Sequence, residues 1–167
     1  MMSKIPIISI VAARSGTGKT TFLEKLIAEL TARGYRVGAI KSDAHGFAID
    51  VPGKDSWRFA EAGARATAII GPNKFALIQQ TEQKRSLDEV AALIEDVDVI
   101  LVEGYKTADK PKIEVVRKEI CPEIISPWEY LLAVVTDLED IPVPVPVLAL
   151  DDYAGAAELI ISKFLRK

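Results

Sequence analysis

Residues 5–30 constrain the fold more than any other stretch, because a glycine-containing loop there separates an apolar run from a helical pattern. Residues 5–11 are nearly all apolar and mostly β-branched, which indicates a strand buried on both faces of a parallel sheet. After Gly18, apolar residues recur at helical spacing as far as Leu30, and Gly34 follows as a stop signal. The stretch therefore predicts a strand, a tight loop and a helix in immediate succession.

The loop matches the phosphate-binding pattern G-x-x-x-x-G-K-[ST] over residues 13–20, except that Ala13 replaces the first glycine. Glycines let backbone N–H groups converge on a phosphate, and the positive end of the helix dipole faces the same anion. Lys19 is predicted to reach the β- and γ-phosphates, and the Thr20 hydroxyl to bind Mg²⁺. Because alanine tolerates only a negative φ without strain, we predict a negative φ for Ala13. An ordinary glycine-rich turn is the alternative, which the flanking strand and helix disfavour.

Residues 97–102 indicate another buried strand, which ends in Glu103 and Gly104. An acidic side chain at the carboxyl end of a strand beside a phosphate loop is where a further Mg²⁺ ligand is expected. Glu103 is therefore predicted to orient the metal or polarise an attacking water, and Gly104 to let the backbone approach phosphate. A solvated carboxylate at the strand end is the alternative.

A second carboxylate, Asp137, follows the predicted strand 131–135. In guanine-nucleotide proteins an aspartate in such a place accepts hydrogen bonds from the base N1–H and N2–H₂, two donors that adenine does not present together. Asp137 is thus the candidate for reading the base. Val134 and Val135 stand where the usual Asn-Lys of the N-K-x-D pattern would be, so a simple turn aspartate stays open as the alternative.

Residues 41–56 are predicted to form a long loop across the mouth of the site, a length typical of functional or mobile loops. It contains His45, the single histidine of the chain, and the carboxylates Asp43 and Asp50. Asp50 or Asp43 is a candidate for contacting the metal or positioning water, as switch loops do. Plain solvation is the alternative for both, and the favoured interpretation for His45.

The remaining signals alternate between strands and helices across residues 1–167, which predicts a single three-layer α/β domain with a mostly parallel sheet and helices on both faces. Gly71-Pro72-Asn73 predicts an antiparallel hairpin that lies at the sheet edge or on a partner surface. Further strands are predicted at 35–41, 66–70, 75–79 and 112–117. Residues 143–147 are predicted to lead into a final strand that ends at Leu150, and their prolines suggest an extended connection or a sheet edge. Helices are predicted at 55–63 with Asp55 or Ser56 as cap, from the capping box Ser86–Glu89 toward Ile94, and after Asp151 or Asp152.

Composition excludes several functional classes. A net charge of −3 gives no basic surface for nucleic acid, and no apolar run reaches membrane-spanning length. The apolar N-terminal run superficially resembles a signal peptide, but cleavage there would destroy the phosphate loop. One cysteine, Cys121, excludes an internal disulfide and fits a reducing compartment. We therefore expect a cytoplasmic protein without nucleic-acid or membrane partners.

With IVAARSGTGKTT, AIKSDAHGFAIDVPGKDS and VILVEGYK in this order, the chain resembles the molybdopterin-guanine dinucleotide biosynthesis adaptor family, MobB, over nearly its whole length. The resemblance implies a P-loop NTPase fold that binds GTP and Mg²⁺, hydrolyses GTP weakly and forms a homodimer. It also implies partners, namely molybdopterin guanylyltransferase and molybdopterin-loading proteins. Thr20 and Glu103 would organise the metal, and Asp50 would belong to the family's middle loop with Lys54 and Asp55. The triphosphate would be bound by Ser15, Gly16, Thr17, Gly18, Lys19, Thr20 and Thr21.

The inferred reaction is in-line attack of water on the γ-phosphate, with Lys19 and Mg²⁺ stabilising charge and Glu103 or Asp50 positioning the water. No residue is an evident efficient catalyst, so hydrolysis is expected to be slow. Arg14 stands where related dimeric P-loop proteins carry a lysine that reaches the partner's nucleotide, although a solvated arginine is favoured. Alternatives are a small-metabolite kinase, a dethiobiotin synthetase-like ligase, a nickel-chaperone GTPase and a nucleotide-gated dimer that only docks partners.

Overall fold

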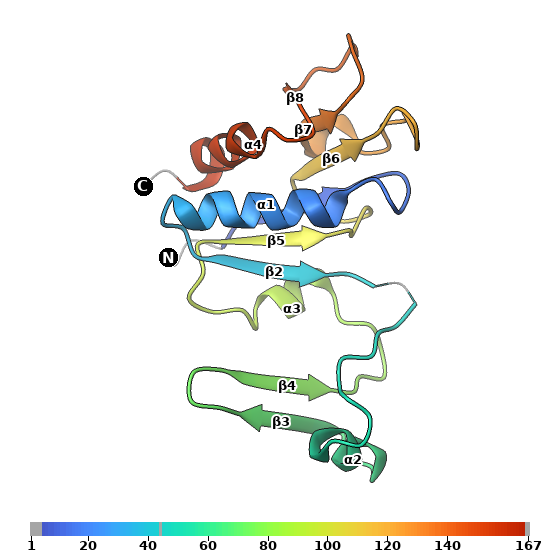
Figure 1. The fold of residues 1–167 in the computed structure, drawn as a ribbon, viewed down its shortest axis with the longest axis vertical. Helices are drawn as coiled ribbons and strands as arrows, with labels where there is room; N and C mark the ends of the chain where they lie inside the picture. Colours follow the sequence, from blue (N-terminus) through green and yellow to red (C-terminus); the bar gives the residue numbers. More distant parts are fainter. Residues whose placement is uncertain (1–4, 44, 166–167) are drawn as a thin grey trace. The chain divides into compact units, whose positions relative to one another are not determined.

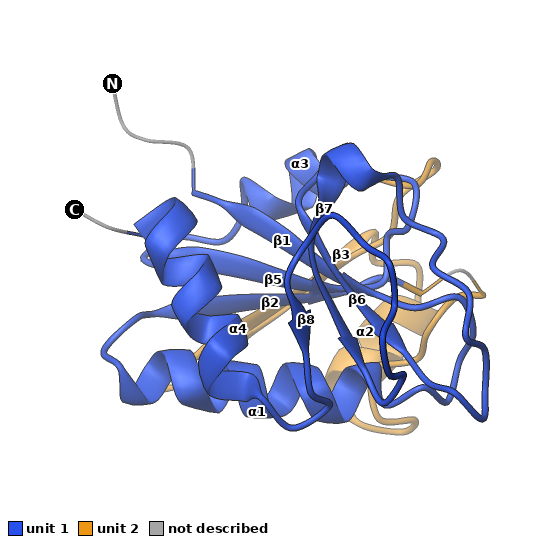
Figure 2. Cartoon of the chain, turned by 90° about the horizontal axis from the view of Figure 1, so that it is seen from above, with its two compact units in different colours: residues 1–42, 87–167 blue, residues 43–86 orange. Residues whose placement is uncertain are grey.

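The computed structural model describes residues 5–43 and 45–165, and these residues divide into two compact units (Figure 2). One unit contains the described residues up to Ser42 together with those from Leu87 onward, and the other lies within residues 43–86. Among the described residues, no helix is long and apolar enough to cross a membrane. The loop that matches the phosphate-binding pattern belongs to the first unit.

The first unit is built on a six-stranded sheet in the order β2-β5-β1-β6-β7-β8, with every neighbouring pair parallel (Figure 1). Every residue of β1, β6 and β7 is buried. The mostly apolar sequences of β1 and β7 predict this burial, whereas β6 also contains two charged residues. The predicted mostly parallel α/β fold is therefore confirmed. The strands are β1 (Ile7–Val11), β2 (Val37–Lys41), β5 (Val99–Glu103), β6 (Lys112–Val116), β7 (Leu131–Thr136) and β8 (Val147–Leu148).

Alternate side chains of β1 serve two separate apolar cores, as the two-residue period of a strand requires. Ile8 and Ile10 pack on one face with Leu26 of α1 and Ile160 of α4. Ile7 packs on the opposite face with the short helix α3. The helical elements of this unit are α1 (Lys19–Ala32), α3 (Leu87–Ala91), the 3₁₀ helix η1 (Trp128–Tyr130), α4 (Tyr153–Ile160) and the π-helix η2 (Ile161–Leu165).

Several predicted elements are shorter in the structure than their sequence patterns suggest, among them the last strand and α3. The final strand, expected to end at Leu150, is reduced to β8, and the preceding residues 143–146 are outside any strand because their prolines have no N–H to donate to a neighbouring strand. It joins the sheet at the edge, where Val134 N donates to Pro146 O at 3.0 Å. Helix α3 ends at Ala91, before the predicted Ile94. By contrast, Asp152 caps α4 as predicted, its carboxylate accepting from Gly155 N at 2.9 Å.

Strand β6 carries two charged side chains that are fully buried, Lys112 and Glu114. The Glu114 carboxylate accepts hydrogen bonds from Ile125 N at 2.8 Å and Ser126 N at 2.9 Å. Lys112 Nζ donates to the carbonyl oxygens of Ala108 and Lys110 and lies 4.8 Å from the centre of the Tyr130 ring. Burial lowers the pKa of Lys112 below its ordinary value. Both charges thus hold connecting segments to the sheet.

The second unit contains the helix α2 (Asp55–Glu61) and the strands β3 (Ala66–Ile70) and β4 (Phe75–Gln79). The two strands pair antiparallel, which confirms the predicted hairpin, and they form a two-stranded sheet of their own instead of an edge of the main sheet. The predicted cap of α2 is wrong. Lys54 occupies the N-cap position without a side-chain cap bond, because the Ser56 hydroxyl donates to Asp50 instead, at 2.8 Å.

Candidate functional site

The phosphate-type loop, which matches the phosphate-binding pattern over residues 13–20, connects the end of β1 at Val11 to the start of α1 at Lys19. Gly16 and Gly18 have φ angles of 79° and 92°, a left-handed conformation that strains any residue with a Cβ. The non-glycine residues with positive φ in the described chain do not include Ala13, so its predicted negative φ is confirmed. Glycine is therefore required at residue 18, the second glycine of the pattern, and dispensable at residue 13, the first.

Two side chains of this segment, Thr17 and Lys19, donate hydrogen bonds to the backbone of the loop itself. Thr17 is buried, and its hydroxyl donates to Arg14 O at 3.4 Å. Lys19 Nζ donates to the same carbonyl at 3.2 Å, so the ammonium curls back over the loop. Burial lowers the pKa of Lys19, the nearby Glu103 carboxylate opposes this shift, and the ammonium of Lys106 adds to it. A partly desolvated cation with another cation beside it is a favourable place for a polyanion.

Thr20 and Glu103 meet at the carboxyl end of β5, where the Thr20 hydroxyl donates to Glu103 Oε2 at 3.0 Å. Both groups offer the hard oxygen atoms that Mg²⁺ prefers, and neighbouring ligands of an octahedral Mg²⁺ stand about 3 Å apart. The pair therefore fits a site at which substrate and water complete the coordination. No cluster of three or more His, Cys, Asp or Glu side chains suited to a metal occurs in the described part of the chain.

Two residues with positive φ follow Glu103. Gly104 has φ 91° and Tyr105 has φ 65°, and Gly104 N donates to Ile10 O at 2.9 Å. This turn brings Lys106 back to the phosphate-type loop, where its Nζ donates to Ala13 O at 2.8 Å. Lys106 is not among the residues that the sequence motifs predict for the site. The glycine after a strand-end glutamate was the available signal that the chain reverses there.

Asp137 follows β7, two strands from β1 at the same edge of the sheet that carries the loop. Its Oδ1 accepts a hydrogen bond from Lys118 N at 2.8 Å, and the residue is otherwise exposed. The carboxylate is therefore held in place by the segment after β6. That anchoring is compatible with the predicted contact to a base and equally with a turn aspartate.

Arg117 is another residue that the sequence analysis did not select. It follows β6, and its Nη2 would lie 3.6 Å from a Cβ placed on Gly18. Its Nε is buried and has no hydrogen-bond partner among the described residues. Arg117 also lines a cavity of about 100 Å³ with Thr21 and Tyr153. Only the folded chain reveals this neighbourhood, because the three side chains come from segments far apart in sequence.

The predicted residues of the middle segment belong to the second unit, and their described contacts are local. Asp50 Oδ1 accepts from Val51 N at 2.9 Å and from the Ser56 hydroxyl. His45 N donates to Asp43 Oδ1 at 2.8 Å. These bonds stabilise turns within the segment, and the assignments of Asp50 and Asp43 to catalysis or metal binding stay predictions.

A parallel sheet with this strand order, and a G-x-G-K-T loop between its first strand and first helix, defines a P-loop NTPase fold. The family model described as molybdopterin guanine dinucleotide synthesis protein B, MobB, matches residues 7–137. Because that match spans most of its length, the chain belongs to the MobB family.

Individual relatives agree with this assignment. The chain is 41% identical over 139 residues to a molybdopterin-guanine dinucleotide biosynthesis adapter protein of Haemophilus influenzae, covering 82% of this chain and 78% of the relative. It is 37% identical over 163 residues to the Escherichia coli protein of the same name, covering 94% and 92%. Among solved structures, Bacillus subtilis MobB is similar with a TM-score of 0.78 at 25% identity, covering 97% of this chain and 99% of that one.

Proposed function

We propose that this chain is a GTP-binding adapter with weak GTPase activity, which assists the attachment of GMP to molybdopterin to form the guanine dinucleotide cofactor. Family membership and the names of the relatives support the pathway. The observation that carries the nucleotide part is the contact between Thr20 and Glu103 beside Lys19, at the mouth of the phosphate-type loop. The partners expected in this role are molybdopterin guanylyltransferase and molybdopterin-loading proteins.

In this proposal the backbone N–H groups of residues 15–21 and the Lys19 ammonium bind the triphosphate. Thr20 and Glu103 hold Mg²⁺, which neutralises charge on the β- and γ-phosphates when it is bound. Gly104, which has no Cβ, leaves room for phosphate beside the strand end. The positive φ of Gly104 means that a side chain there would strain the turn as well as narrow the site.

Guanine would be read by Asp137. The hydrogen bond from Lys118 N fixes Oδ1 of the carboxylate, so Oδ2 is the oxygen proposed to accept from the base. Holding a carboxylate in advance lowers the entropic cost of binding the base. Hydrolysis would be slow, because Glu103 is left to orient water and the described residues around the loop include no dedicated base.

The binding proposal is tested by calorimetric titration of GTP, ATP and XTP, with Mg²⁺, into wild-type protein and an Asp137→Asn variant. Asparagine keeps an oxygen for Lys118 N but presents an amide donor to the base. We expect the variant to lose affinity for GTP by about 10- to 100-fold, as for a lost charged hydrogen bond. It should gain affinity for XTP, whose C2 carbonyl accepts from the amide. Equal or tighter binding of ATP by the wild type would contradict the proposal and favour a kinase or ligase.

The metal proposal has its own test. Glu103→Gln keeps the size and an oxygen but removes the charge, so the Mg²⁺ concentration needed for half-maximal GTP binding should rise about tenfold or more. Glu119→Gln removes an exposed carboxylate and serves as the control. Equal Mg²⁺ requirements in both variants would eliminate Glu103 as a ligand.

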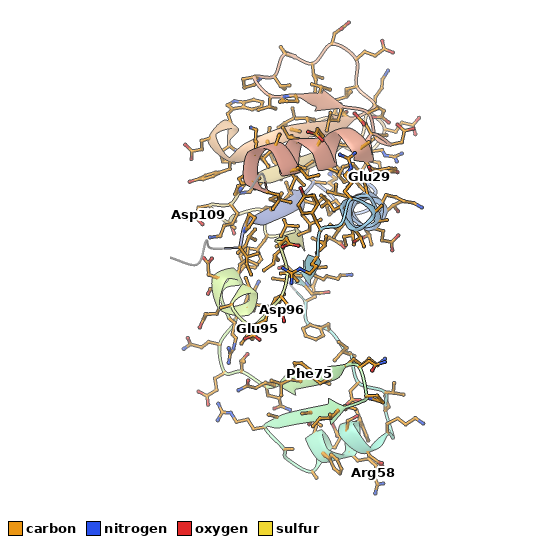
Figure 3. The ribbon with its side chains drawn as sticks, turned by 90° about the vertical axis from the view of Figure 1, so that its left-hand side faces the viewer. Glu29, Arg58, Phe75, Glu95, Asp96 and Asp109 are labelled. Carbon is orange, nitrogen blue, oxygen red and sulfur yellow. The ribbon has the colours of Figure 1, made fainter. Side chains whose placement is uncertain are left out.

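We also propose that the hairpin of the second unit forms a homodimer interface. Ile70, Phe75 and Leu77 are 86%, 78% and 57% exposed, and register places them on one face of β3 and β4 (Figure 3 labels Phe75). An apolar strand face of this kind is typical of an interaction surface. Light scattering should show that Phe75→Glu lowers the molecular mass in solution, whereas Lys74→Glu on the same turn does not. A wild-type monomer would overturn this proposal alone.

A further inference from the structure

The ammonium group of Lys106 is held at the phosphate-type loop by a hydrogen bond to a neutral carbonyl oxygen. Its Nζ donates to Ala13 O at 2.8 Å, the carbonyl of the first pattern residue. Lys19 is held in the same way on the next carbonyl, that of Arg14. Two ammonium groups thus rest on successive carbonyls of one loop, although a carbonyl is a weaker partner for a cation than an anionic oxygen is.

The backbone that delivers Lys106 to this place is strained. Tyr105 has φ 65°, a conformation that is uncommon for a bulky residue and costs free energy. Its ring compensates by packing against the apolar core formed by Ile7, Ile100 and Val102. Gly104 supplies a second positive φ immediately before it. Strained backbone maintained by packing is concentrated at functional sites, and here its result is the position of the next residue, Lys106.

The surrounding charges show what ligand this arrangement would take. The Lys106 ammonium helps to lower the pKa of Lys19, so the two cations are close enough to repel. Glu103, the acidic neighbour, is engaged by the Thr20 hydroxyl. A group with several negative oxygens would relieve the repulsion and give both ammonium groups stronger partners. The terminal phosphate of a nucleoside triphosphate has that chemistry.

We propose that Lys106 is a second phosphate-binding cation, which exchanges Ala13 O for the terminal phosphate of a nucleoside triphosphate and so distinguishes triphosphate from diphosphate. This inference rests on the proposed nucleotide-binding function. Lys19, at the start of α1, remains the general phosphate ligand and contacts both classes of nucleotide. Lys106, carried by the strained turn after β5, responds only to the additional phosphate.

The test compares the affinities of the full-length protein for GDP and for the non-hydrolysable β,γ-imido analogue of GTP, with Mg²⁺. Lys106→Met keeps the length of the side chain and removes the charge. We expect it to weaken the triphosphate analogue by about 10- to 100-fold, the loss typical of a charged hydrogen bond, and GDP by less than about threefold. Lys106→Arg should recover much of the difference. Lys25→Met, which removes an exposed positive charge from α1, should bind both nucleotides as the wild type does.

A purely structural role for Lys106, as a latch on Ala13, gives a different result. Loss of the latch would weaken GDP and the triphosphate analogue by the same factor, and that outcome would overturn the inference. Unchanged affinity for both ligands would overturn it too, while the proposed function would stand. If wild-type protein bound neither nucleotide, the proposed function and this inference would both fall. Thermal unfolding of each variant establishes that it is folded.

Discussion

Strands β5 and β4 have the same length and similarly apolar sequences, VILVE and FALIQ, yet one is almost wholly buried and the other almost wholly exposed. Strand β5 lies between β2 and β1 and is covered by apolar side chains on both faces. Strand β4 pairs only with β3. The number of neighbours, and not the sequence of the strand, decides which apolar residues become core.

The main sheet and the hairpin of β3 and β4 should also differ in what substitutions change. The apolar residues of the main sheet are buried within their own unit, so substitutions there should change the free energy of unfolding. The hairpin leaves Ile70, Phe75 and Leu77 exposed, so substitutions there should leave folding nearly unchanged and act on association.

The largest expected effect is on the main sheet. Leu101→Ala removes a side chain of β5 that is fully buried, so the free energy of unfolding should fall by about 2–5 kcal/mol through lost burial and a residual cavity. Urea denaturation followed by circular dichroism measures it. The matched change Leu77→Ala in β4 should cost much less, and similar losses in the two variants would refute the contrast.

The next effect concerns the buried carboxylate of β6. Glu114→Gln keeps one acceptor but turns an amide N–H₂ toward the backbone N–H of Ile125 or Ser126, so one hydrogen bond is lost and two donors face each other. We expect a loss of about 1–3 kcal/mol in the free energy of unfolding. Glu119→Gln, on the exposed segment that follows β6, is the control and should be neutral. A neutral Glu114→Gln would mean that the carboxylate does not hold this segment.

A smaller effect should appear as pH dependence. Burial lowers the pKa of Lys112 in the folded chain, so between that value and the unfolded value near 10.4 the unfolded chain binds more protons. The penalty for burying the charge is therefore fully present below the folded pKa and is relieved as pH rises through the window. The free energy of unfolding of the wild type should rise relative to that of Lys112→Met in alkaline solution. Parallel pH profiles would show that Lys112 does not titrate differently on unfolding.

The smallest effect is expected at the exposed hairpin. Ile70→Thr keeps the β-branched shape and changes a side chain that is 86% exposed, so the free energy of unfolding should change by less than about 0.5 kcal/mol. Denaturation at low protein concentration, where association is weak, is the relevant measurement. A loss comparable with that of Leu101→Ala would show that this face is covered in the folded protein.

Local patterns predicted the fold where the local and global demands agree. The strands 66–70 and 75–79 were predicted with the observed boundaries, because a strong turn sequence separates two short β-prone runs. The succession of β1, loop and α1 was equally clear, and the cap of α4 was narrowed to Asp151 or Asp152, of which Asp152 is the cap. The N-cap at Lys54 was missed, since the Ser56 hydroxyl found a tertiary partner that no local rule reveals.

The candidate site was predictable only in part. The loop residues and Glu103 follow from a pattern that joins sequence directly to chemistry. Lys106 depends on two successive positive φ angles, of which the sequence signals only the one at Gly104. Arg117 depends on the approach of β6 to the loop, which no local pattern signals. The buried Lys112 and Glu114 interrupt an otherwise apolar strand, and hydrophobic patterns alone predict that such charged positions are exposed.

The strand order also has a consequence for synthesis of the protein on the ribosome. Strand β1 is made first, but its hydrogen-bonded neighbours are β5 and β6, which end at Glu103 and Val116. At about 5–20 residues per second, the ribosome needs roughly 5–20 s to add the residues between them. During that interval β1 has neither of its neighbouring strands, and only α1 is available to cover one of its faces. This apolar strand therefore stays unpaired for most of the synthesis of the sheet, which is the kind of exposed segment that chaperones bind.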